Sequence, residues 1–151
     1  GTLAKYYKVS YDYVYKLPEN MDMEEGAMVE PVSVAVQVCN RAQVRANDSV
    51  IIFGCGPIGL LCQAVSKAFG CKKVIGVDIS DGRLKFAKEF GADSVYKMPI
   101  KTLSESSEAF AKRVSTDIKD TFGLGGGADV ILEATGAESC IQVGVFVARP
   151  E

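Results

Sequence analysis

Six residues between an apolar run and a helical pattern have the spacing of a phosphate-binding turn. The segment GCGPIG at 54–59 follows the run SVIIF directly and has the form G-x-G-x-x-G. Gly54 would allow a sharp turn out of a strand, Gly56 would let a pyrophosphate approach the main chain, and Gly59 would let the next helix pack closely. Pro57 suits a first helical turn, where its missing N–H is not needed.

An acidic residue follows this turn at the distance typical of dinucleotide-binding proteins. Asp78 ends the next apolar run, 73–77, and lies 19 residues after Gly59. An acid about 20 residues after the glycines accepts hydrogen bonds from the ribose hydroxyls. Its charge would repel a 2′-phosphate, so the sequence predicts NAD rather than NADP. The alternative is an ordinary turn followed by an acid at a strand end.

Three further residues each have a functional and a structural interpretation. Arg83 begins the next helical pattern, where it either brackets the adenosine end of the coenzyme or is solvated. Thr135 follows the last apolar run, either near the nicotinamide half or in a plain strand-to-helix turn. Glu30 lies within the apolar stretch AMVEPV, as a helix-start residue, a metal ligand or the anchor of a metal-bound water.

From residue 49 onward short apolar runs alternate with helical patterns. Such alternation predicts βαβ units and an α/β fold, a Rossmann-type doubly wound parallel sheet. We expect four strands of the six in a full dinucleotide-binding sheet, and therefore an incomplete, aggregation-prone sheet in this chain alone. The expected strands are 49–53, 73–77, 93–96 and 128–133, and the expected helices are 60–69 (starting near Pro57), 81–90, 104–121 and 137–148.

The first 48 residues follow a different pattern. Tyr- and Val-rich segments predict two short strands at 4–10 and 13–17. A helix is expected at 21–29 after an Asn20 cap, and a second at 31–40 with Pro31 in its first turn. We expect a domain boundary between residues 29 and 30.

Composition excludes several classes of protein. The 151 residues are 48% hydrophobic and 24% charged with a net charge of −2, typical of a globular domain rather than a disordered chain or a nucleic-acid binder. No apolar run has the roughly 18–20 residues of a membrane span. The chain has no His. Its five cysteines have no C-x-x-C spacing, which predicts reduced thiols in a cytoplasmic protein.

Five segments together resemble the zinc-dependent medium-chain dehydrogenase/reductase family. Within that family the resemblance is to the polyol branch of sorbitol, arabinitol and, above all, fungal xylitol dehydrogenases. The segments are GTLAKYYKVS, LPENMDMEEGAMVEPVSVAV, DSVIIFGCGPIGLLCQAVSKAFG, VIGVDISDGRLKFAKEFGAD and DVILEATGAESCI. The resemblance implies that residues 1–29 end a segment of a GroES-like catalytic domain, and that 30–151 belong to an NAD-binding domain truncated at its C-terminus.

The resemblance also implies an activity. The whole protein would oxidise xylitol, or a related polyol such as sorbitol or L-arabinitol, to a ketose with NAD and zinc, as a cytoplasmic dimer or tetramer. This chain alone would be inactive, because the other zinc ligands lie outside it. The positions that match family functions are Gly54, Gly56 and Gly59 at the pyrophosphate, Ile58 beside the cofactor, Asp78 and Arg83 at the adenosine, and Glu30 at the catalytic zinc.

Three alternatives remain open at this point. They are a zinc-free medium-chain reductase, a methyltransferase that binds S-adenosylmethionine, and a non-catalytic nucleotide-binding module. The methyltransferase would bind S-adenosylmethionine instead of NADH, the zinc-free reductase would lack the metal, and the non-catalytic module would not turn over xylitol or sorbitol.

Overall fold

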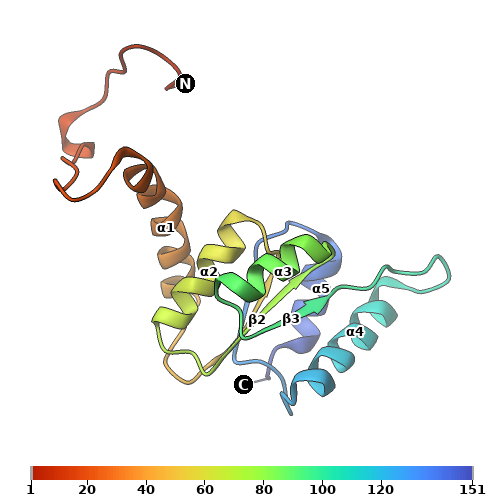
Figure 1. Ribbon diagram of the computed structural model, residues 1–151. Coiled ribbons are helices and arrows are strands. Elements are labelled where there is room, and N and C mark those ends of the chain that lie inside the picture. The colour runs from red at the N-terminus through yellow and green to blue at the C-terminus, as the bar shows by residue number, and fades with distance from the viewer. Residues whose placement is uncertain (1, 151) are drawn as a thin grey trace. The chain divides into compact units, whose positions relative to one another are not determined.

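The computed structural model describes residues 2–150 of the chain (Figure 1). Residues 1 and 151, the outer limits of the two expected domains, lie outside this range. The chain divides into two compact units, the first ending at Glu30 and the second beginning at Pro31. Helix α1 (Met23–Arg41) starts in the first unit and ends in the second.

The first unit is largely irregular. It contains a short 3₁₀ turn, η1 (Tyr11–Tyr13), and the two strands predicted at 4–10 and 13–17 are wrong. A strand needs a neighbour that accepts and donates its main-chain hydrogen bonds. No described residue of this unit pairs with either segment, so the high strand propensity of their Tyr and Val residues does not produce a sheet.

One helix replaces the two that the sequence predicts at 21–29 and 31–40. Asp22, rather than Asn20, caps α1: its carboxylate accepts the Glu25 N–H at 2.8 Å, and the Glu25 carboxylate accepts the Asp22 N–H at 3.0 Å. This reciprocal pair is a capping box. Pro31 lies inside the helix. Its fixed φ is helical, so the chain continues through it at the loss of one hydrogen bond.

The second unit is built on a parallel four-stranded sheet. Its strands are β1 (Ser49–Phe53), β2 (Lys73–Asp78), β3 (Ser94–Lys97) and β4 (Val130–Glu133). Their order is β3-β2-β1-β4, and every pairing is parallel. The predicted α/β, Rossmann-type sheet is therefore confirmed.

Helices cover both faces of this sheet (Figure 1). They are α2 (Pro57–Ala68), α3 (Asp81–Phe90), α4 (Ser107–Phe122) and α5 (Glu138–Val147). Alternate residues of β1 point to opposite faces. Ile51 packs with residues of α4 and α5, whereas Ile52 packs with residues of α2 and the last turns of α1. The two cores hold the carboxyl ends of the strands in place.

Side-chain hydrogen bonds lie at two element ends that differ from the predicted ones. Helix α4 starts at Ser107 rather than 104, because the Ser106 hydroxyl caps it by accepting the Ala109 N–H at 3.1 Å. Strand β3 starts one residue later than predicted, and just before it the Asp93 carboxylate accepts the Val74 N–H at 2.8 Å. Within residues 2–150, no helix has the length and apolar character needed to cross a membrane.

Candidate functional site

The glycine turn between β1 and α2 has close contacts that exclude larger side chains. Gly54 has a φ of +98°, and a Cβ there would lie 3.0 Å from Thr135 Cγ2. A Cβ on Gly59 would lie 1.8 Å from the carbonyl oxygen of Gly54. Helix α2 therefore starts directly against the turn, and this approach requires glycine at both positions.

The outer side of the turn is open. A Cβ on Gly56 would meet no heavy atom of the described residues within 4 Å. Gly56 precedes α2 as its N-cap residue, Pro57 opens the helix, and no described side chain caps it. The N–H groups of the first turn and the positive end of the helix dipole are thus available to an anion. Ile58 is half-buried and packs against the core beneath α2.

Asp78 lies at the carboxyl end of β2, next to this turn. Its carboxylate accepts the Cys55 N–H at 2.8 Å on Oδ2 and the Ser80 N–H at 2.9 Å on Oδ1. Arg83 Nη1 lies 3.8 Å from Oδ2, while its side chain is largely exposed. Two main-chain donors therefore fix the carboxylate, and each oxygen retains a lone pair for a further donor.

A cavity of about 380 Å³ lies beside Asp78. It brings together three residues predicted from the sequence, namely Asp78, Arg83 and Thr135. Its other walls come largely from the segment after β3 and from the start of α5. These additional lining residues are Val77, Ile79, Met98, Pro99, Ile100, Lys101, Phe110, Ala137, Ser139 and Cys140. Apolar walls with a carboxylate at one end suit a flat heterocycle joined to a sugar.

The segment after β3 has no motif that identifies it in the sequence, although a general rule predicts its role. Ligands of parallel sheets bind at the carboxyl ends of the strands. Met98 to Lys101 follow the carboxyl end of β3, which neighbours β2. The apolar pattern of β3 is weak and contains no residue with a chemical role of its own, so the sequence does not distinguish these residues.

Glu133 contributes to the site through hydrogen bonds that no sequence motif predicts. Its carboxylate accepts the main-chain N–H of Thr135 at 2.7 Å and the Thr135 hydroxyl, as well as the Gly136 N–H at 3.0 Å. The Thr135 hydroxyl in turn accepts the Ala137 N–H at 2.9 Å. These bonds fix the conformation of the loop after β4, which lies close to Gly54 of the glycine turn.

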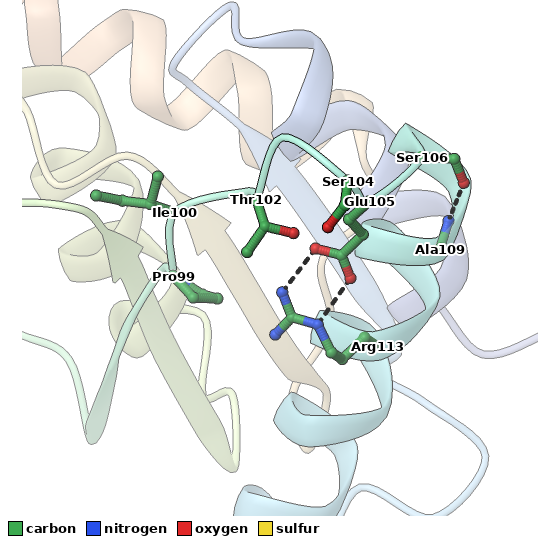
Figure 2. Close-up of a pocket in the computed structure, with 8 residues that line it drawn as sticks. All are labelled: Pro99, Ile100, Thr102, Ser104, Glu105, Ser106, Ala109 and Arg113. Atoms are coloured by element: carbon green, nitrogen blue, oxygen red, sulfur yellow. Dashed lines mark hydrogen bonds and ion pairs between the residues drawn. The ribbon is translucent and has the colours of Figure 1, made fainter.

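A larger, open hollow of about 800 Å³ adjoins the first cavity and shares Pro99 and Ile100 with it (Figure 2). Its main charged groups are paired: Arg113 donates to the Glu105 carboxylate through two bonds, of 2.8 and 3.0 Å. The Arg113 guanidinium lowers the pKa of Glu105. The opposite charges of Glu105 and Arg113 therefore neutralise each other within this hollow.

Glu30 lies in the first unit, so it is not among the residues that the structure brings together in the second. It is an exposed residue of α1. Among residues 2–150, no three or more His, Cys, Asp or Glu side chains are grouped closely enough to hold a metal ion. A metal role for Glu30 therefore stays a prediction.

All five cysteines of the chain are buried thiols outside any disulfide. Cys55 lies within the glycine turn. Burial raises the pKa of its thiol, the Asp78 carboxylate raises it further, and a hydrogen bond from Gln63 acts in the opposite direction. The thiol is therefore neutral near pH 7 and adds no charge beside a phosphate-binding turn.

Comparison with known proteins gives the family of the chain. Residues 57–151 match the family model described as "Zinc-binding dehydrogenase". The chain is 45% identical over 150 residues to "Probable D-xylulose reductase A" of Arthroderma otae and 46% identical over 150 residues to "D-xylulose reductase A" of Aspergillus oryzae. Each alignment covers 99% of this chain and 40% of the relative, so the chain spans about two fifths of their length.

Solved structures share the fold. A putative zinc-binding dehydrogenase from Sinorhizobium meliloti, bound to NADP, superposes with a TM-score of 0.74 at 25% sequence identity. The match covers 89% of this chain and 36% of that one.

Proposed function

The chain belongs to the zinc-binding dehydrogenase family, and from that premise we propose that its glycine turn and Asp78 hold NAD(H) in an enzyme that interconverts a polyol and a ketose. The observation that carries the proposal is the fixed Asp78 carboxylate, which lines a cavity beside an uncapped helix start. A methyltransferase is not favoured, since both the family model and the named relatives are dehydrogenases or reductases.

The residues of the chain fit the coenzyme in three places. The open side of Gly56 leaves room for a diphosphate against the main chain, and the first N–H groups of α2 face it. The Asp78 carboxylate has lone pairs for the ribose hydroxyls. The apolar walls after β3 suit the adenine ring, with Arg83 at their rim.

The other predicted positions have supporting roles in this proposal. Gly54 and Gly59 permit the close approach of turn and helix. Pro57 begins the helix at a position where its missing N–H is not needed, and Ile58 packs the helix onto the core. Thr135, fixed by Glu133 beside Gly54, lies toward the nicotinamide half.

We propose NAD rather than NADP because of charge. A 2′-phosphate on the adenosine ribose would lie close to the Asp78 carboxylate, and like charges in a partly buried site repel strongly. The Sinorhizobium meliloti protein shares this fold and is bound to NADP, so the preference proposed for NAD rests on Asp78 and not on the fold. When bound, NAD supplies the acceptor of a hydride. The chain's own residues bind and orient it.

We propose zinc because the chain belongs to a zinc-binding family, and not because the described residues form a zinc site. In a dehydrogenase a zinc ion acts as a Lewis acid on the substrate oxygen. The described residues do not group enough ligands to hold one, so they do not fit a complete zinc site. We propose that Glu30 contributes one carboxylate toward such a site. A lower zinc content in the Glu30→Ala protein, with unchanged NADH affinity, would support this role.

The substrate proposed is xylitol, with D-xylulose as the product. The support is the similarity to D-xylulose reductases, at 45% and 46% identity. Sorbitol and L-arabinitol are the alternatives. We further propose a cytoplasmic homo-oligomer in which residues 1–29 end a catalytic-domain segment and 30–151 form the coenzyme domain.

One experiment tests the function directly. The intact protein is titrated with NADH by fluorescence, and turnover of xylitol, sorbitol and L-arabinitol is followed by NADH formation. We expect NADH binding and the highest kcat/KM with xylitol. Absence of NADH binding would refute the coenzyme site, whereas binding without turnover of any of the three polyols would refute the substrate class alone.

A further inference from the structure

Gln63 is a buried amide that packing alone does not explain. It lies on α2, has no exposed surface, and donates from Nε2 to the Cys55 Sγ at 3.5 Å. Its Oε1 has no hydrogen-bond partner among residues 2–150. A buried amide oxygen without a donor is unfavourable, and leucine would fill a similar volume without that penalty.

Strand β2 is shaped to receive this amide. A Cβ on Gly76 would lie 2.9 Å from Gln63 Nε2 and 3.0 Å from Cys55 Sγ. Gly76 precedes Asp78 by two residues, so both face the same side of the sheet. The amide and the thiol thus fill the space over β2 immediately before the carboxylate.

Cys55 connects the amide to the carboxylate. Its side chain accepts the bond from Gln63, while its main-chain N–H donates to Asp78 Oδ2 at 2.8 Å. A shift of Cys55 would move that N–H away from the carboxylate. The position of one residue in the glycine turn therefore depends on α2 through its thiol and affects Asp78 through its backbone.

We propose that Gln63 is a positioning residue for the coenzyme site: by holding Cys55, it keeps the turn's N–H on the Asp78 carboxylate. The proposal rests on the coenzyme-binding role proposed above for Asp78. A hydrogen bond to a neutral partner contributes modestly, so removal of this one is expected to change affinity about three- to tenfold.

The test compares Gln63→Leu with Ser66→Ala in the intact protein. Ser66 is a matched control, because it is a fully buried polar residue of the same helix whose hydroxyl lies near Cys39, not the turn. The Cys55 amide exchange rate is measured by NMR on protein labelled with ¹⁵N-cysteine. Thermal unfolding and NADH affinity are measured in parallel.

For Gln63→Leu we expect about three- to tenfold faster exchange of the Cys55 amide and a weaker NADH affinity by the same factor, at an equal or higher Tm. Ser66→Ala should change neither exchange nor affinity. A lower Tm with unchanged exchange would show that Gln63 only packs, and would overturn the proposal. Exchange of the Cys55 amide is measured without coenzyme, so it tests the role of Gln63 even if the protein does not bind NADH. Absence of NADH binding to the wild-type protein would refute the proposed function instead.

A double-mutant cycle identifies the route. In the Cys55→Ala background, Gln63→Leu should produce no further weakening of NADH binding, because the sulfur through which the amide acts is gone. Additive losses from the two substitutions would contradict an anchor that works through the thiol.

Discussion

The main-chain N–H of Cys55 donates a 2.8 Å hydrogen bond to Asp78 Oδ2, which ties the turn after β1 to the end of β2. Parallel pairing in the register Phe53↔Val77 places these two strand ends side by side. The proposed diphosphate and ribose contacts are therefore fixed relative to each other by the fold itself. Such preorganisation lowers the entropy lost when a ligand binds.

Gly59→Ala should destabilise the protein and weaken coenzyme binding together. The new Cβ would lie 1.8 Å from the Gly54 carbonyl oxygen, so the turn or the helix must move. Overpacking of this kind costs about 1–3 kcal/mol. Thermal unfolding and NADH titration check the result. An unchanged Tm would mean that the close approach of helix and turn is wrong.

Gly56→Ala should separate stability from binding. Its φ of −78° is accessible to alanine, and the new methyl group would meet no described atom within 4 Å. We expect the free energy of unfolding to change by less than about 0.5 kcal/mol. The methyl would project where the diphosphate approaches, so NADH affinity should fall about tenfold or more. Equal affinity in the variant would place the diphosphate elsewhere.

Asp93→Ala should remove stability that depends on pH. Burial raises the pKa of this carboxyl, but the bonds from Lys67 and the Val74 N–H outweigh it, and the net shift is downward. A depressed pKa stabilises the fold above the unfolded value of about 3.9 and ceases to do so as the pH falls through the folded value. We expect a loss of about 1 kcal/mol at pH 7.

Urea unfolding of both proteins from pH 7 to pH 3 measures this difference. The difference in free energy of unfolding between wild type and Asp93→Ala should be constant down to about pH 5 and become smaller below about pH 4. If this difference in free energy became larger at low pH, the pKa of Asp93 would be raised in the folded protein and not lowered.

Most strands and helices of the second unit could be predicted because each is specified by the residues within it. Short runs of β-branched residues, separated by helices with glycine or serine at their ends, specify a parallel sheet locally. The sites at Gly54, Gly59 and Asp78 follow from spacing along the chain. The cavity walls after β3 do not, since their position depends on β3 lying beside β2.

The first unit shows where local sequence information fails. Residues 4–10 have strand propensity, yet a strand is stable only with a partner, and propensity does not supply one. Pro31 predicts a helix start, but its helical φ also permits an interior position, at the loss of one hydrogen bond. The role proposed for the buried Gln63 could not be predicted either, because it depends on the contacts of this residue with Gly76 and Cys55 in the folded chain.

The ratio of the NADPH and NADH dissociation constants, measured for wild type, Asp78→Ala and Asp81→Ala, tests the central claim most directly. Both coenzymes use the same turn, so the ratio cancels any loosening of the turn itself. Asp81 is an exposed acid three residues away that pairs with Lys97 at 2.6 Å, and it controls for a general change of charge.

Asp78→Ala should weaken NADH binding about tenfold or more and lower the ratio by at least that factor, because a charge-assisted hydrogen bond is lost and a repulsion removed. Asp81→Ala should leave the ratio within about twofold of wild type, since an exposed charge is screened by solvent. A wild-type preference for NADH that persists in Asp78→Ala would contradict the account.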